Sequence, residues 1–285
     1  MDKKDNLEVI RKAMGDDSIQ EVKLDDTFNF KCQQCGKCCM NRTDIIINPF
    51  DVYNGARYLG ITPTEFIKEY CFTDLGAHSK IPIVLLATTE NGFCPLLKYD
   101  VKDGGKFKCS INPAKPGVCA NHPIGLAHST DVSTGEQNTT FIKVEQCPHS
   151  VSDEKQVVRD WIKPYLDHQE EIVMAREIQS LVVKYMEPRK YWALLCLLNE
   201  VAKTQKSGEE LIKMCMAQYI SVPVGLGYTN YDINKPFIEQ AKENMKELEA
   251  FYKKTKDLYE ELLTSFEKIT GKLFDEEMKR FEEYQ

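Results

Sequence analysis

The stretch CQQCGKCC at residues 32–39 decides how this chain is interpreted, because it places four cysteines within eight positions. Two-residue gaps between cysteines let a tight turn direct two sulfurs at one ion, while backbone N–H groups hydrogen-bond to those sulfurs. Gly36 provides the positive φ that such a turn needs. Packing gives no good reason for this spacing, so the stretch predicts a metal site.

Eleven cysteines occur among the 285 residues, and nine of them fall between Cys32 and Cys147. The chain begins with charged residues, shows no signal-peptide pattern and has no apolar run of about 18 residues or more. We therefore expect a cytoplasmic protein, in a reducing compartment where cysteines serve metal ligation or redox chemistry in preference to disulfides. The predicted metal ligands are Cys32, Cys35, Cys38, Cys39, Cys94, Cys109, Cys119 and Cys147.

The identity of the metal stays open between iron and zinc. The Cys-x-x-Cys-Gly turn suits a single zinc or a rubredoxin-like iron, whereas Cys-x-x-Cys-x-x-Cys with remote Cys-Pro pairs resembles ferredoxin-type ligation. A ferredoxin run would have its fourth cysteine at position 42, where this chain has Arg42. Eight thiolates are twice what one tetrahedral site or one cubane uses. We expect the sulfurs of Cys38 and Cys39 to diverge toward two ions or two cluster corners, and we favour an iron–sulfur cluster or multinuclear iron, with zinc as the alternative.

The remaining cysteines and the nearby cations receive different interpretations. Cys196 and Cys215 lie in apolar helical settings and are expected to pack in the core, while Cys71 is open between packing and ligation. Cations close by in sequence would offset the thiolate charge, although each alone reads as an ordinary surface charge. They are Lys31, Lys37, Arg42, Lys106, Lys108 and Lys115.

A family resemblance rests on several segments between residues 28 and 123. They are FKCQQCGKCC at 30–39, DVYNGARYL at 51–59, FIKEY at 66–70, CPL at 94–96, CSI at 109–111 and KPGVCANHP at 115–123. This pattern resembles the CxxCxxCC proteins, YkgJ-type cysteine-cluster proteins regarded as zinc- or iron-chelating. Where that family usually has an aromatic residue before the last proline, this chain has His122, which is a candidate extra ligand or a packing histidine.

The amino-acid composition allows a folded core and limits the kinds of partner that we expect. An apolar content of 42% is enough for a core, and the net charge of −7 shows no basic footprint, so we expect neither nucleic-acid nor membrane partners. The fold prediction is mainly α, with a small loop-rich cysteine metal-binding domain followed by an α-helical bundle that has a long C-terminal helix. The predicted ranges are an N-terminal extension over 1–27, the metal-binding domain over 28–150 and the helical domain over 151–285.

Within the cysteine domain we expect helices over 51–59 and 63–70, the second capped by Thr62, and short strands at 45–47 and 81–87. In the helical domain we expect helices over 154–186, with a kink at Pro164, and over 189–206. A capping box at 207–210 should start a third helix, and the Gly- and Pro-rich segment 221–236 reads as a loop.

The last predicted helix carries a heptad seam, because its apolar positions are spaced alternately by four and three. The seam residues are Ala241, Met245, Leu248, Tyr252, Thr255, Tyr259, Leu262, Phe266, Ile269 and Leu273. Aromatics and a threonine in the seam favour packing within the chain's own bundle, with a homodimer through this helix as the alternative.

Two functions follow from these features. The first is a metal-binding protein whose site is structural or serves metal handling, with a protein partner that the sequence does not identify. The second is an iron–sulfur enzyme for redox or group transfer, distantly similar to flagellin lysine methylases, with substrate held between the cysteine domain and the helices. Only the segment 222–231, with its glycines and aromatics, suggests a substrate loop. Phosphate loops, nucleophile elbows and dinucleotide fingerprints are absent from the sequence, so whether a reaction is catalysed stays open.

Overall fold

The computed structural model describes residues 7–8, 11–12, 19–130, 137–144 and 152–283. The chain is mainly helical with few, small strands, which confirms the predicted fold class. It divides into two compact units that alternate along the sequence, Met1–Ile45 with Ala87–Gln169, and Ile46–Leu86 with Glu170–Gln285. These limits differ from the predicted boundaries at residues 27 and 150, since 46–86 groups with the later helices. No described helix is long and apolar enough to cross a membrane.

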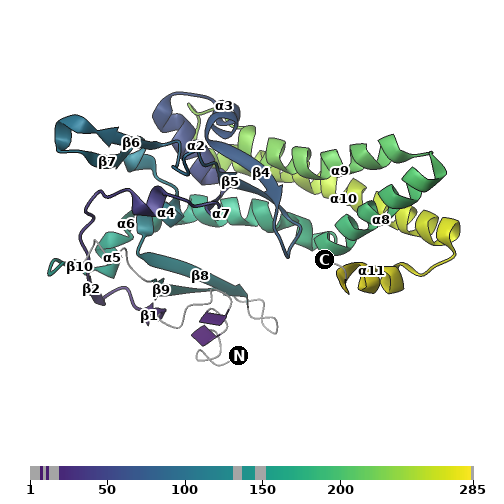
Figure 1. Cartoon of the computed structure of the whole chain (residues 1–285), viewed down its shortest axis with the longest axis horizontal. Helices are drawn as coiled ribbons and strands as arrows, with labels where there is room; N and C mark the ends of the chain where they lie inside the picture. Colours follow the sequence, from purple (N-terminus) through teal and green to yellow (C-terminus); the bar gives the residue numbers. More distant parts are fainter. Residues whose placement is uncertain (1–6, 9–10, 13–18, 131–136, 145–151, 284–285) are drawn as a thin grey trace. The chain divides into compact units, whose positions relative to one another are not determined.

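The first unit, which carries the cysteine stretch, is built around small antiparallel sheets (Figure 1). They are β1 (Gln20–Val22), β9 (Gln137–Lys143) and β8 (Ile124–Thr130) in that order, β2 (Thr27–Asn29) with β10 (Lys155–Val157), and β6 (Leu97–Asp100) with β7 (Lys106–Cys109). Short helical turns complete it: η1 (Lys37–Cys39), η2 (Val101–Asp103), η3 (Asn112–Ala114), α4 (Gly117–Asn121), α5 (Val158–Trp161) and α6 (Lys163–Asp167). Phe28, Phe30 and Ile142 are buried, so this unit has an apolar core that its loop-rich sequence did not predict.

The predicted continuous helix over 154–186 is wrong, because its first residues form a strand and the rest is divided into separate helices. Residues 155–157 form β10, because they pair with β2 and because the backbone N–H of Phe30 donates to the carbonyl of Glu154 over 3.0 Å. Pro164 does not kink a long helix, since it lies in the first turn of the short helix α6, where its missing N–H is harmless. Regular helix resumes as α7 (Gln169–Ser180), followed by η5 (Leu181–Lys184).

The second unit begins with the elements between residues 46 and 86. Strands β3 (Ile46–Ile47), β5 (Pro82–Leu86) and β4 (Cys71–Leu75) form one antiparallel sheet in that order, which confirms the two predicted strands. Helices α2 (Pro49–Leu59) and α3 (Pro63–Tyr70) confirm the two predicted helices, and each starts with a complete capping box. Strand β5 is mostly buried and packs against α9, which explains why this segment groups with the helices.

The helical part comprises α8 (Pro188–Gln205), α9 (Glu209–Val224), α10 (Phe237–Thr270) and α11 (Phe274–Glu283), with α8 in contact with the other three (Figure 1). The capping box at 207–210 is wrong, because α9 starts after Gly208 at φ 82°, without a side-chain cap. The loop over 221–236 is wrong in its first part, since α9 continues to Val224 and the π-helix η6 (Gly225–Thr229) follows.

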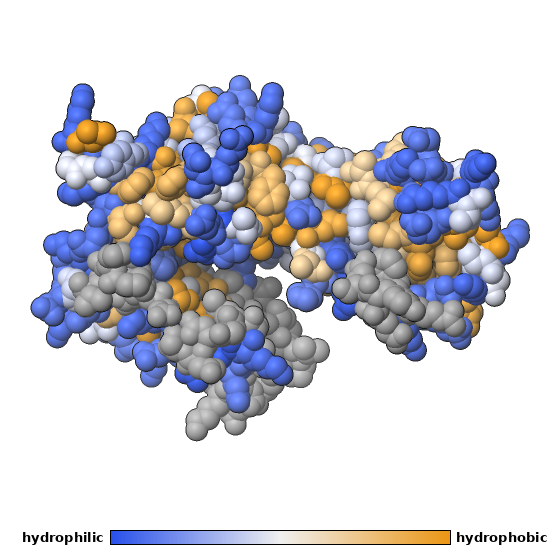
Figure 2. All heavy atoms as spheres, viewed as in Figure 1, coloured by the Kyte–Doolittle hydropathy of each residue, from blue (hydrophilic) through white to orange (hydrophobic). Residues whose placement is uncertain are grey.

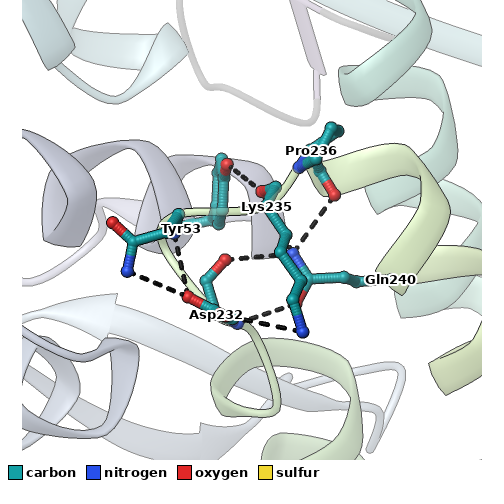
Figure 3. A network of polar contacts seen from close by, with 6 residues as sticks. Tyr53, Asp232, Lys235, Pro236 and Gln240 are labelled. Atoms are coloured by element: carbon teal, nitrogen blue, oxygen red, sulfur yellow. Dashed lines mark hydrogen bonds and ion pairs between the residues drawn. The ribbon is translucent and has the colours of Figure 1, made fainter.

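A polar network fixes the start of α10 (Figure 3). Gln240 Nε2 donates to the backbone carbonyls of Asp232, Lys235 and Pro236 over 3.0 to 3.1 Å. The hydroxyl of Tyr53 donates to the carbonyl of Lys235 over 2.6 Å, which joins α2 to this turn. The long helix therefore begins at a position set by side chains of its own unit.

The seam of α10 packs within this unit. Ala241, Leu248, Tyr252, Thr255 and Phe266 are all buried, which agrees with packing in the chain's own bundle. Ile269 and Leu273, at the end of the seam, are more than half exposed. Hydrophilic residues are mixed with apolar ones over the visible surface of α8, α9 and α10 (Figure 2). A homodimer through α10 stays a prediction.

Candidate metal centre

The cysteine stretch is an extended turn held by the backbone of neighbouring segments. Its two left-handed residues are Gln34 at φ 53° and Gly36 at φ 74°. The carbonyl of Gln34 accepts from the N–H of Phe107 over 2.9 Å, and the carbonyl of Cys39 accepts from the N–H of Cys94 over 2.8 Å. A Cβ at position 36 would lie 2.9 Å from Cγ of Phe107, so the glycine is required both for conformation and for space.

The remote cysteines are placed by the same unit. Cys109 ends β7 opposite Leu97, and the N–H of Ser110 donates to the carbonyl of Leu96 over 2.8 Å. Cys119 lies in α4, where its N–H donates to the carbonyl of Pro116 over 2.8 Å. The β6–β7 pairing and the α4 turn thus bring residues about 70 to 80 positions apart in sequence to the cysteine stretch.

These segments surround one cavity of about 540 Å³. The predicted ligands that line it are Cys32, Cys35, Cys38, Cys39, Cys109 and Cys119. His122 lines it as well, together with Lys108 and Lys115 and with the aromatic rings of Phe30, Phe107 and Trp161. Six thiols therefore face one space, together with cations, polar residues and aromatic rings.

Two predicted ligands stand apart from this set. Cys94 is not among the cavity-lining residues, but its thiol is close enough to those of Cys39 and Cys109 to interact with them electrostatically. Cys147 lies outside the described residues. Among the residues that the structure describes, no three Cys, His, Asp or Glu side chains are arranged to hold one ion together. The donor chemistry fits a soft metal, and closing a coordination shell requires thiols to rotate or a further ligand to join.

The sulfurs of Cys38 and Cys39 lie 3.8 Å apart, so the expectation that they diverge is wrong. Two thiolates at about 2.3 Å from one tetrahedral ion are separated by about 3.8 Å, so the pair has the spacing for a shared ion. The hydrogen bond from Cys39, helped by the charges of Lys115 and Arg42, lowers the pKa of Cys38 to about 6. The same hydrogen bond and burial raise the pKa of Cys39. The two shifts have opposite directions, so the pair favours a form in which the Cys39 thiol donates to the Cys38 thiolate.

Burial raises the pKa of Cys94 and of Cys109, which keeps both thiols protonated until a cation offsets the loss of solvation. Arg42 makes two hydrogen bonds to Asp44, over 2.6 and 2.8 Å. Its positive charge also interacts electrostatically with Cys38 and Cys119. Of the predicted cations, Lys31 forms an ion pair with Glu154, while Lys108 and Lys115 border the cavity.

His122 is the histidine of this site, and the sequence had left its role open. Its Nε2 is buried and has no hydrogen-bond partner among the described residues. Burial first, and then the charge of Arg42, lower the pKa of the imidazole, which keeps it neutral and able to bind a metal. Leaving a buried acceptor or donor unpaired costs about 1–3 kcal/mol, so the side chain fits a site that supplies a partner.

The three remaining cysteines belong to the other compact unit. Cys215 is buried in α9, which confirms its packing role, and Cys196 is half-buried in α8. Cys71 starts β4 and is half-buried; it stays open as a ligand.

The thiols and cations around this cavity have the donor chemistry of a metal-chelating site. Residues 31–148 match the model of the CxxCxxCC family, described as a putative zinc- or iron-chelating domain. The match confirms the family resemblance for this segment, which makes up less than half of the chain. The match takes in residues 46–86 of the second unit, so the family segment does not coincide with one compact unit. No curated protein and no solved structure matched the chain.

Proposed function

We propose that this protein binds an iron centre with more than one metal ion, a sulfide-bridged cluster or a multinuclear thiolate site, through the cysteines around the cavity. The observation that carries this proposal is the gathering of six cysteines from three separate segments around a single space of about 540 Å³. Four thiolates complete one tetrahedral ion, so six thiols with Cys94 beside them exceed what a single ion uses.

The electrostatics of the site support the same conclusion. Thiolates near one another repel, and Arg42 and Lys115 provide positive charge that acts on Cys38. Unliganded thiols with a lowered pKa are readily oxidised, so a thiol cluster of this kind is better explained by bound metal. A reducing compartment such as the cytoplasm would suit it, and we propose that location.

The exposure of the site favours metal handling over a purely structural role. Cys32 and Cys38 are exposed, so an ion held by them would be accessible to competing ligands from solvent. The unit also has its own sheets and apolar core, which reduces its need for a metal as its main source of stability. We therefore propose an exchangeable centre.

The enzyme alternative receives no specific support from the segment 222–231. Tyr228 and Tyr231 are buried, and their hydroxyls are engaged with Gln179 over 2.8 Å and with the carbonyl of Gly227 over 2.9 Å. These contacts give the aromatic residues of the segment a packing role within their own unit.

The experiment is alkylation mapping under anaerobic conditions, in which thiols are labelled in metal-free and iron-loaded protein and located by mass spectrometry. We expect iron to protect the eight predicted ligands, Cys147 included, while Cys196 is labelled equally in both samples. Equal labelling of Cys32, Cys35 and Cys38 with and without metal would overturn the proposal.

A further inference from the structure

His122 is held beside the thiols by two neighbouring segments. It follows α4 directly, three residues after Cys119, and both residues line the cavity. Trp161 Nε1 donates to the carbonyls of Asn121 and His122 over 3.1 and 3.2 Å, which fixes the backbone at this point. The ring of Phe30 meets the imidazole edge to face, with centroids 6.2 Å apart at 82°. The imidazole is therefore positioned by groups that do not use its nitrogens.

The unpaired Nε2 is the second observation. Buried side-chain nitrogens nearly always have a partner, and this one has none among the described residues. The cavity that His122 lines is bordered by Phe30, Trp161 and thiols, and also by Lys108 and Lys115. The charge of Arg42 acts on the ring, but a guanidinium is a donor that cannot accept a hydrogen bond from it. A neutral imidazole beside thiolates is a common partner of theirs on zinc and on iron.

We propose that His122 supplies an imidazole nitrogen to the metal centre, which makes it a mixed thiolate–imidazole site; this inference rests on the proposed function. The donor set then carries one negative charge fewer than an all-thiolate set. In iron–sulfur centres, replacing thiolates by imidazoles raises the reduction potential. His122→Cys should therefore lower the potential of an iron centre relative to the native protein.

X-ray absorption at the metal edge tests the inference, because it detects imidazole scattering around iron and zinc alike. We expect a mixed sulfur and nitrogen shell with imidazole scattering in the native protein, lost in His122→Phe. That variant carries the kind of residue that the family usually has there, so it should fold. Loss of a first ligand should weaken metal affinity at least about tenfold in chelator competition.

Two matched controls identify the histidine. His168→Gln removes an exposed histidine of the same unit, and His149→Gln removes the one that follows Cys147-Pro148 in sequence. Imidazole scattering that survives both controls and disappears in His122→Phe supports the inference. An all-sulfur shell in the native protein, or scattering lost in His149→Gln and retained in His122→Phe, would overturn it while leaving the metal centre in place. A native protein without metal would overturn the proposed function itself.

Discussion

Gly36→Ala should damage the cysteine turn for two additive reasons. The position has φ 74°, and a left-handed conformation costs a residue with a Cβ about 1–2 kcal/mol. The new methyl group would lie 2.9 Å from Cγ of Phe107, and such overpacking adds about 1–3 kcal/mol. Gly104 is the matched control in the same unit, because it has φ 66° and open space around it. Gly104→Ala should carry only the conformational part.

The assay is iron affinity by chelator competition, together with denaturant unfolding of the metal-loaded protein. The excess of about 1–3 kcal/mol in Gly36→Ala corresponds to a combined loss of about 5- to 150-fold relative to Gly104→Ala. If the turn of the metal-free protein relaxes and releases the strain, the substitution lowers the affinity for iron. If the turn stays strained without metal, the substitution lowers the free energy of unfolding instead. Equal effects of the two substitutions would show that the contact with Phe107 does not hold the turn, and would refute this reasoning.

Three further predictions concern the metal site. Cys35→Ser should lower the amount of metal bound per chain in elemental analysis, while Cys196→Ala should leave it unchanged. Full metal content in Cys35→Ser would count against the site. Removal of the metal by a chelator should increase hydrogen exchange in residues 31–40 and 106–121. Strand β5 and helix α10 should stay protected, since both pack in the other unit. Equal exchange with and without metal would show that the cysteine turn is preformed. Because burial raises the pKa of Cys94 and Cys109, both must release a proton on binding, so affinity should rise by up to about tenfold per proton for each pH unit between pH 6 and 8. Affinity that is independent of pH in that range would exclude them as ligands.

Local signals in the sequence were sufficient to predict several helices. Thr62, Pro63 and Glu65 specify the start of α3 by capping chemistry alone, and the spacing of apolar residues specifies α10. The break in the helix predicted over 154–186 could not be seen in this way. Strand β10 forms because it pairs with β2, 126 to 130 residues earlier, and a long-range partner overrides local helical preference.

In the candidate site too, local sequence predicted some features, while long-range contacts determine the others. The cysteine spacing at 32–39 predicted the metal-binding segment, and six of the eight predicted ligands line one cavity. Backbone hydrogen bonds join Cys39 to Cys94 and Gln34 to Phe107. No local pattern in the sequence encodes these long-range contacts. The sulfurs of Cys38 and Cys39 are close together within the 3-10 turn η1, whereas the sequence argument expected these neighbouring side chains to diverge.

Metal and acid-labile sulfide analysis of protein purified without oxygen tests the central claim most directly. We predict more than one iron per chain in a brown protein, with broad absorption near roughly 400 nm that bleaches on reduction. A colourless protein with about two zinc ions per chain and no iron would refute the choice of iron. A folded protein that contains no metal at all, and takes none up from iron or zinc salts, would contradict the account.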